Sequence, residues 1–310
     1  MSVFQVSKAY KIVAADAARG ELSHAYLFVC PDARNLRGWL LELAVLIAGG
    51  DGRVSDLIRR EMYADCRVMP APGGKLTVAD VRDLVDDCCI RPIEGDKKIY
   101  VLDNAQDMNA AAQNKLLKVL EEPPANVYFL LGATNEYPVL PTVRSRTKKL
   151  ELSSFSDGEI EKYIREKYPA RDDAEKIAAV SGGIVGRAED LAEGGSLAAK
   201  GEELALLAMN LTVASAVSAS KKYADKSEAD AFLSVLRLVY RDILMLKLGR
   251  GGNLLSGGEE RALRKAAGRY TAAALVNAQE KIAETERNLK FNANLSVSLE
   301  TLLIAILEGR

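Results

Sequence analysis

The chain has 310 residues, which is enough for two or three domains at roughly 100–200 residues each. Its composition, 48% hydrophobic and 27% charged, is that of a globular protein and excludes a disordered chain. The formal net charge of -1 excludes overall basicity as a means of binding nucleic acid, so any such contact would need a local patch.

The sequence also predicts where the protein works. Residues 1–20 lack the continuous apolar core of a signal peptide. The most apolar segment, Trp39 to Ala48, is too short to span a bilayer and contains Glu42. The cysteines have no spacing typical of a disulfide framework. We therefore expect a cytoplasmic protein with reduced thiols.

The N-terminal segment predicts a helix followed by a strand. Residues 1–19 form an amphipathic pattern, with Val6, Tyr10 and Val13 spaced to face a core. The run from His24 to Cys30, HAYLFVC, predicts a buried strand. His24 is the only histidine and has no evident nucleophile or metal-ligand partner, so we expect it to be structural.

A helix start follows further along the chain. Thr77 is a suitable N-cap residue, and Asp80 stands three residues later, as in a capping box. The helix that they begin would turn Val78, Val81 and Leu84 toward the core.

The stretch from Lys98 to Leu152 has the strongest pattern. Ile99 to Leu102 and Val127 to Leu131 are short apolar runs, which predict buried strands of a parallel sheet. Between them, Asn109 to Glu122 predicts a helix that ends at Pro123-Pro124. The segment LPTVRSRTKKLEL then predicts a short turn or helix and a third strand.

Polar residues collect at one edge of this predicted sheet. Asp103 and Asn104 follow the first of these strands, at the carboxyl end where open α/β sheets place their ligands. Arg144 and Arg146 are expected to be exposed before the third strand.

The C-terminal half is predicted to be helical. Ser156 and Glu159 form a capping-box pattern after a hinge at Ser153 to Ser156. Helices are expected over Asp172 to Val180 and Val185 to Ala192, and from about Gly201 onward the chain is wholly helical. Its apolar stripe includes Phe232, Val235, Leu236, Val239, Tyr240 and Ile243, and a loop is expected at Gly249 to Gly258.

Two motifs carry a specific resemblance. NAAAQNKLLKVLEEPPANVYFLL followed by LPTVRSR is similar to the AAA+ core of DNA polymerase clamp-loader subunits. Ser145 and Arg146 match the Ser-Arg pair of that family's Ser-Arg-Cys motif, with Thr147 in place of Cys. The resemblance covers most of the chain, more loosely toward the C-terminus. It implies a degenerate AAA+ α/β domain with a RecA-like parallel sheet over residues 1–152, a small helical lid over 153–200 and an all-α collar over 201–310.

The same resemblance implies that the ATP-binding loop is degenerate. Such a loop needs glycines, a lysine for the phosphates and Ser/Thr for magnesium. Aligned on HAYLF, the corresponding positions hold Cys30, Ala33, Asn35, Leu36 and Arg37. We expect a solvated loop that binds no nucleotide, although Arg34 and Arg37 could still attract an anion.

Other family positions point the same way. Asp103 matches the magnesium-associated Asp of the Walker B strand, but Asn104 replaces the glutamate that acts as base. Cys66 stands alone where many members carry a four-cysteine zinc module, so no metal is expected. Arg187 matches the nucleotide-sensing arginine of the lid, or is a surface or interdomain residue.

The resemblance therefore implies a subunit of the DNA polymerase III clamp loader without ATPase activity or cofactor. Its partners would be the gamma/tau and delta subunits, with the sliding clamp and primed DNA reached through the complex. Ser145 and Arg146 would complete a neighbour's ATP site, with Arg146 as an arginine finger in trans. Alternatively, Arg146 pairs with a carboxylate such as Glu151.

Four further interpretations stay open at this point. Arg144, Lys148 and Lys149 form a basic cluster that could touch DNA or be a solvated surface. The catalytic gamma/tau ATPase of the same machine would need the groups that Leu36 and Asn104 have replaced. The clamp-binding delta subunit would not be expected to keep LEEPP and the Ser-Arg pair, and an unrelated DNA-binding regulator would need a basic recognition element.

Overall fold

The computed structural model describes residues 3–49, 52–193, 206–207, 209–250, 254, 256, 260–289 and 294–309. The chain divides into two compact units, Met1–Ser153 and Ser154–Arg310. Within the described residues, no helix is both long and apolar enough to cross a membrane.

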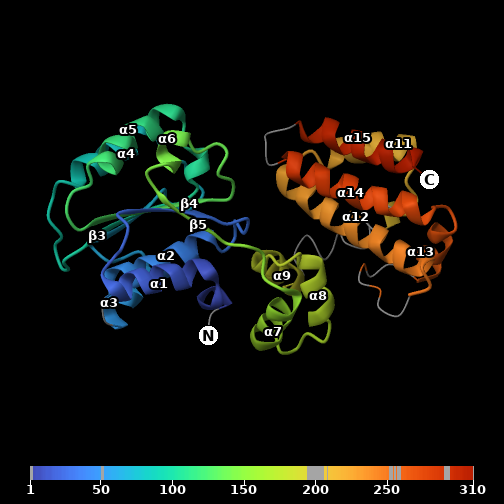
Figure 1. Ribbon diagram of the computed structural model, residues 1–310, viewed down its shortest axis with the longest axis horizontal. Coiled ribbons are helices and arrows are strands. Elements are labelled where there is room, and N and C mark those ends of the chain that lie inside the picture. Colours follow the sequence, from blue (N-terminus) through green and yellow to red (C-terminus); the bar gives the residue numbers. More distant parts are fainter. Residues whose placement is uncertain are drawn as a thin grey trace. The chain divides into compact units, whose positions relative to one another are not determined.

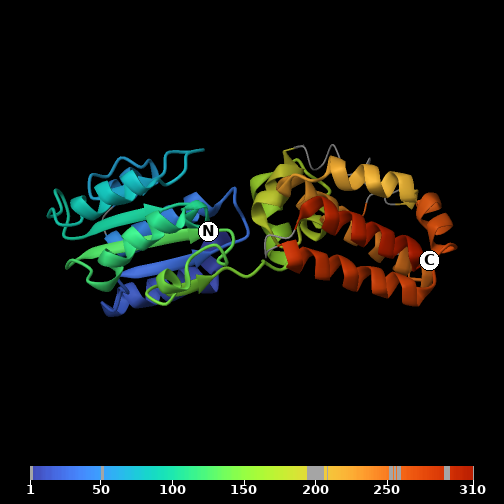
Figure 2. The same ribbon diagram turned by 90° about the horizontal axis from the view of Figure 1, so that it is seen from above.

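The first unit is built on a five-stranded parallel sheet, confirming the expected α/β class (Figures 1 and 2). Its strands lie in the order β2-β3-β4-β1-β5. They are β1 (Ala25–Val29), β2 (Cys66–Met69), β3 (Lys98–Leu102), β4 (Val127–Ala133) and β5 (Lys148–Glu151). In the register of the central strands, Leu27 of β1 lies opposite Leu131 on one side and Lys149 on the other.

Helices cover both faces of this sheet (Figure 1). One layer contains α1 (Lys8–Arg19), α2 (Leu36–Ala48) and α3 (Gly52–Arg59), preceded by the 3₁₀ turn η1 (Val3–Val6). The other contains α4 (Val78–Asp87), α5 (Ala110–Glu121) and α6 (Pro141–Arg144), and the 3₁₀ turn η2 (Ala105–Asp107) follows β3. Because both faces are covered, the central strands consist mainly of apolar residues, although β3 begins with Lys98.

Close packing of α2 on the sheet depends on one glycine. A Cβ atom on Gly132 of β4 would lie 2.4 Å from Cδ1 of Leu40 and 3.2 Å from Cδ1 of Leu36. A larger residue at this position would push α2 away from the sheet. The first turn of α2, which contains Leu36 and Arg37, is thus fixed against β4.

Several sequence predictions are corrected here. The N-terminal helix does not start at residue 1, because Ser7 caps α1 by accepting a hydrogen bond from the amide of Tyr10. Val6 consequently falls outside the helical phase and is exposed, whereas Val13 is fully buried. In the helix after Thr77, Val78 is exposed while Val81 and Leu84 are buried.

The stretch between α2 and β3 contains structure that the sequence pattern did not predict. Neither α3 nor β2 was expected, and β2 forms an edge of the sheet. Helix α2 also begins at Leu36, three residues before the predicted start at Trp39. Leu36 and Arg37 are therefore part of a helix and not of a solvated loop.

The second unit is helical throughout its described residues. Three short helices come first, namely α7 (Asp157–Lys167), α8 (Ala174–Ser181) and α9 (Val185–Ala192). The helices that follow are α11 (Val213–Lys222), α12 (Lys226–Lys247), α13 (Glu260–Ala267), α14 (Ala272–Leu289) and α15 (Leu295–Glu308). Helices α12, α14 and α15 run side by side in Figures 1 and 2.

The apolar stripe of α12 forms the core of this unit. All six residues predicted for the stripe are buried, among them Leu236, Val239 and Ile243 at 0% exposure. Tyr240 adds a buried polar link, since its hydroxyl lies 3.1 Å from that of Tyr270. Most of the predicted loop at residues 249–258 lies outside the described residues, and the division of this unit near residue 200 stays a prediction.

Candidate functional site

The polar residues singled out in the sequence gather at the carboxyl edge of the sheet. Cys30 follows β1 and Asp103 follows β3, with β4 lying between these two strands. In a doubly wound sheet this edge is where a ligand binds. The groups present there decide whether a nucleotide could be held.

A carboxylate of the protein itself, that of Asp32, lies at the start of α2. The Asp32 carboxylate accepts hydrogen bonds from the backbone amide of Asn35 (3.1 Å) and from its side-chain Nδ2 (3.0 Å). Asp32 is buried, so its negative charge stands at the N-terminus of α2, where a phosphate would otherwise be attracted. Sequence reasoning missed Asp32, although an Asp three residues before Asn35 is a common capping arrangement.

The neighbouring positions, Cys30, Ala33 and Leu36, offer no side chain that could bind a phosphate. Cys30 is fully buried, its sulfur accepts a hydrogen bond from the amide of Asp32 (3.4 Å), and burial raises the pKa of its thiol to about 12. Leu36, at the lysine position, is fully buried and faces Gly132 of the sheet. Ala33 is exposed and brings no polar side chain.

Arg37 occupies the position of the magnesium-binding Ser/Thr, and its guanidinium is fully engaged. Nε and Nη2 each donate to a different oxygen of Glu61 at 2.6 Å, and Nη1 donates to the carbonyl of Pro70 at 2.9 Å. The same Nη1 lies 3.5 Å from Oδ2 of Asp103. The hydrogen bonds and charge of Glu61 raise the pKa of Arg37, so the cation is permanent.

Asp103 is therefore paired with a protein cation at the end of β3. It is 8% exposed, and its Oδ1 has no hydrogen-bond partner in the described part of the chain. Burial raises the pKa of this carboxyl, while the charge of Arg37 acts against that shift. Asn104 turns away from it, because its Oδ1 accepts from Nε2 of Gln106 at 3.0 Å.

These groups do not fit a magnesium-nucleotide. A phosphate at the start of α2 would meet the carboxylate of Asp32, and a magnesium ion beside Asp103 would meet the guanidinium of Arg37. Like charges at such distances repel strongly in a partly buried site. The expectation that Arg37 could attract an anion from solution is also corrected, because two carboxylates already surround it.

The Ser-Arg pair lies on a firmly held segment of the same unit. Gln113 of α5 is 2% exposed and donates to the carbonyls of Met108 and Pro138, while its Oε1 accepts from the amide of Leu140 (2.7 Å). Leu140 precedes α6, and Ser145 ends it. The buried amide thus ties the beginning of α6 to α5.

Arg146 is half-exposed just after α6. Its Nη1 donates to the carbonyl of Thr142 (3.0 Å), and its Nη2 lies 2.6 Å from Oε1 of Glu121, the last residue of α5. The expected alternative partner, Glu151, instead lies 3.3 Å from Lys149. Arg146 therefore does pair with a carboxylate, but it is one that belongs to the LEEPP motif. The Ser145 hydroxyl donates to the carbonyl of Thr142.

The basic cluster around Arg146 is locally neutralised. Lys149 Nζ lies 2.6 Å from Glu136, and Arg144 Nη1 lies 3.8 Å from the same carboxylate. Lys148 Nζ lies 2.6 Å from Asp16, which is buried. Because each cation already has an acidic partner, this cluster is a weak candidate for DNA phosphates.

The remaining predicted residues have structural contacts. His24 lies with Nε2 3.2 Å from the carbonyl of Leu120, which agrees with a structural role. Cys66 is buried in β2, and burial raises the pKa of its thiol to about 12. Among the residues that the structure describes, no group of three or more His, Cys, Asp or Glu could hold a metal ion.

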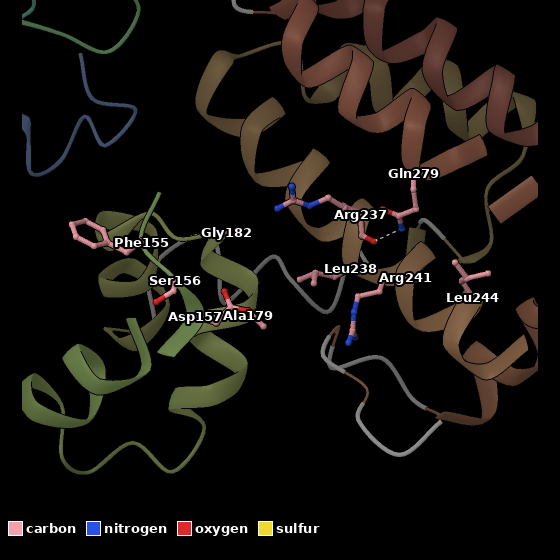
Figure 3. A pocket seen from close by; sticks show the side chains of 10 residues that line it. All are labelled: Phe155, Ser156, Asp157, Ala179, Gly182, Arg237, Leu238, Arg241, Leu244 and Gln279. Carbon is pink, nitrogen blue, oxygen red and sulfur yellow. Dashed lines mark hydrogen bonds between the residues drawn. The ribbon is translucent and has the colours of Figure 1, made fainter. Parts of the chain in front are cut away.

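In the second unit, Arg187 links two helices. It donates from Nη1 to the hydroxyl of Ser234 on α12 at 2.8 Å. A pocket of about 560 Å³ opens elsewhere between α8 and α12, and its lining includes Phe155, Arg237 and Arg241 (Figure 3). Both arginines have acidic neighbours, Arg237 at 3.6 Å from Glu286 and Arg241 at 2.8 Å from Asp242.

Fold and site together define a class of protein. The first unit is an α/β module with a parallel sheet covered by helices on both faces, and an internal ion pair between Arg37 and Asp103 stands at the carboxyl edge of that sheet, while Arg146 is partly exposed. Residues 5–156 match the family model described as "DNA polymerase III, delta subunit". The resemblance of the first unit to clamp-loader subunits is therefore confirmed.

Similarity to one relative extends over nearly the whole chain. The DNA polymerase III subunit delta' of Bacillus subtilis is 24% identical over 316 residues, covering 94% of this chain and 93% of that protein. The DNA polymerase III subunit gamma/tau of Mycobacterium tuberculosis is 39% identical over 70 residues, covering 23% of this chain and 12% of that protein. A DNA polymerase III gamma subunit-related protein from Thermotoga maritima superposes with a TM-score of 0.42 at 17% identity, covering 96% and 99% of the two chains.

Proposed function

We propose that this chain is the delta-prime-type subunit of a DNA polymerase III clamp loader. In this role it assembles with gamma/tau and delta and takes part in loading the sliding clamp onto primed DNA. It hydrolyses no ATP itself, and Arg146 acts in trans at the ATP site of a neighbouring subunit.

One observation carries this proposal, namely the contrast between Arg37 and Arg146. Arg37 is surrounded by Glu61, Pro70 and Asp103, and it fills the place where a nucleotide's magnesium would lie. Arg146 has a side chain that is 35% exposed and can reach a group outside the chain. A guanidinium can make paired hydrogen bonds to phosphate oxygens, and such fingers contribute about 10³–10⁵ in rate in GTPases.

The extent of similarity also favours this assignment over the two alternatives. The delta' relative aligns over nearly the full length of both chains, whereas the gamma/tau relative aligns over a short stretch. A catalytic ATPase role is further disfavoured by the burial of Leu36 at the lysine position. The family description "DNA polymerase III, delta subunit" covers residues 5–156, whereas the delta' relative aligns over nearly the whole chain, and this favours the delta-prime role over a clamp-binding delta role.

The decisive experiment reconstitutes the loader from the cognate gamma/tau, delta and clamp proteins. Arg146→Ala and Arg146→Lys should leave folding and assembly nearly intact but lower DNA-dependent ATP turnover and clamp loading. The loss in total turnover should be partial, because the other ATP sites keep their own fingers. Unchanged loading by the Arg146→Ala complex would reject the role in trans.

Arg165→Ala is a matched control. Arg165 on α7 is also an exposed arginine paired with a glutamate, since its Nη2 lies 2.7 Å from Glu161. An exposed pair of this kind contributes about 0.2–1 kcal/mol to stability. Its removal should leave both turnover and loading unchanged, so a common loss in both variants would point to an unspecific effect of removing surface arginines.

A further inference from the structure

Glu121 holds Arg146 in a defined orientation. Nη2 of Arg146 lies 2.6 Å from Oε1 of Glu121, and Nη1 donates to the carbonyl of Thr142 at 3.0 Å. Two different nitrogens are thus held by two different elements, α5 and α6. A guanidinium restrained at two points has far less rotational freedom than one on a free side chain.

The support for Glu121 is rigid. It is the last residue of α5, whose Leu116 and Leu120 are buried against the sheet. Pro123 and Pro124 follow after Glu122 and prevent the helix from continuing. The carboxylate therefore projects from a fixed point of the core and not from a free loop.

A cationic partner stabilises Glu121 at its position at the end of α5. Carbonyl groups at the C-terminus of a helix give it a partial negative charge, which disfavours a carboxylate there. The guanidinium of Arg146 offsets this repulsion at close range. Glu122, the next residue, is equally exposed but has no ion pair in the described part of the chain.

The contacts leave part of the guanidinium accessible. The Arg146 side chain is 35% exposed, although Nη1 donates to the carbonyl of Thr142 and Nη2 lies 2.6 Å from Glu121. Its exposed part can therefore meet phosphate oxygens while these two contacts persist. Pairing with Glu121 and binding of an external anion are compatible.

We propose that Glu121 is a positioning residue for Arg146, which orients the guanidinium toward the phosphates of the neighbouring subunit's ATP. This inference rests on the proposed function and extends it to a residue that never touches the nucleotide. A carboxylate that competed with phosphate for Arg146 would lower ATP turnover, whereas a positioning carboxylate raises it. Removal of Glu121 therefore changes turnover in opposite directions for the two roles.

The experiment compares Glu121→Ala and Glu121→Gln with Glu122→Ala in the reconstituted loader. Glu121→Ala should reduce the part of the turnover that depends on Arg146 by about two- to five-fold, the range expected for an exposed ion pair. The loss should appear in kcat, with KM for ATP unchanged, because orientation matters in the transition state. Glu121→Gln should restore part of it, since an amide oxygen can still accept from Nη2.

A double variant shows whether the effect passes through Arg146. In the Arg146→Ala background, Glu121→Ala should cause no additional loss. A loss that persists there would assign Glu121 a structural role, and increased turnover in Glu121→Ala would make it a competitor of phosphate. Either outcome overturns the inference, as does a Glu121→Ala complex that behaves like Glu122→Ala.

The same set of variants separates failure of the inference from failure of the proposed function. If Arg146→Ala lowers turnover and Glu121→Ala does not, only the positioning role is wrong. If Arg146→Ala itself changes nothing, the role in trans fails and the positioning role fails with it.

Discussion

Nη1 of Arg37 lies 3.5 Å from Oδ2 of Asp103, so a guanidinium and a carboxylate face each other where the parallel sheet would place a nucleotide. The cation comes from the first turn of α2 and the carboxylate from the end of β3. Glu61 holds the same guanidinium through two hydrogen bonds of 2.6 Å. An internal contact thus joins the sheet and the helix at this edge.

The first prediction is that the isolated chain binds no magnesium-ATP. Asp32 supplies the anion at the start of α2, and Arg37 supplies the cation beside Asp103. Titration calorimetry should therefore show no saturable heat, whereas the cognate gamma/tau subunit gives the positive control. Binding in the micromolar range would contradict the assignment of these groups.

The second prediction concerns stability. Arg37→Ala leaves Asp103 and Glu61 without their cation, and a buried group that loses its partner typically costs about 1–3 kcal/mol. Urea unfolding at neutral pH should show a loss of that size. Arg59→Ala is the control, because the Arg59 side chain is 44% exposed against 18% for Arg37, and its pair with Glu42 is worth about 0.2–1 kcal/mol.

This loss should depend on pH. The pKa of Asp103 is raised by burial, so its folded form favours the proton, and removal of Arg37 raises that pKa further. A carboxyl whose pKa is raised in the folded state contributes its full stability at pH values below the pKa of the unfolded state. This stability is lost as the pH rises through the pKa of the folded state. The deficit of Arg37→Ala should thus shrink as the pH falls from 7 toward about 4. A deficit that is constant over this range would mean that Asp103 is not involved.

The third prediction is that one cysteine reacts quickly with a thiol reagent in the folded protein. Cys89 is exposed, whereas Cys30, Cys66 and Cys88 are buried. Burial raises the pKa of Cys30 and Cys66 to about 12 and that of Cys88 to about 11. Since the thiolate is the reactive form, these three should react only after unfolding. Cys89→Ser should remove the fast phase, and a remaining fast phase would show that a buried site opens readily.

The fourth prediction tests the role of the helical unit in assembly. A fragment of residues 1–153 should unfold cooperatively, because the first unit has its own core, but should not co-elute with gamma/tau. Cutting after residue 200 is a poorer test, since α9 would lose the hydrogen bond from Arg187 to Ser234. Normal association of the shorter fragment would make the collar assignment wrong.

The sequence by itself determined the features that depend on neighbouring residues. The capping boxes of Thr77 with Asp80 and of Ser156 with Glu159 are both present. The apolar runs around Ile99 and Val127 form strands at the predicted places. These signals arise within a few residues, where periodicity and capping act, so no knowledge of the fold was needed.

Only the tertiary structure decided which charges meet. Glu61 lies in a stretch whose helix and edge strand gave no clear pattern, and nothing local shows that it holds Arg37. Likewise, the sequence allowed Arg146 to pair with Glu151, but the order of helix and sheet brings it to Glu121. An ion pair depends on distance in space and a pattern depends on distance along the chain. The sequence therefore showed which residue types stand near the carboxyl edge, whereas the pairing of Arg37 with Asp103 became evident only once the parallel sheet brought α2 and β3 to one edge.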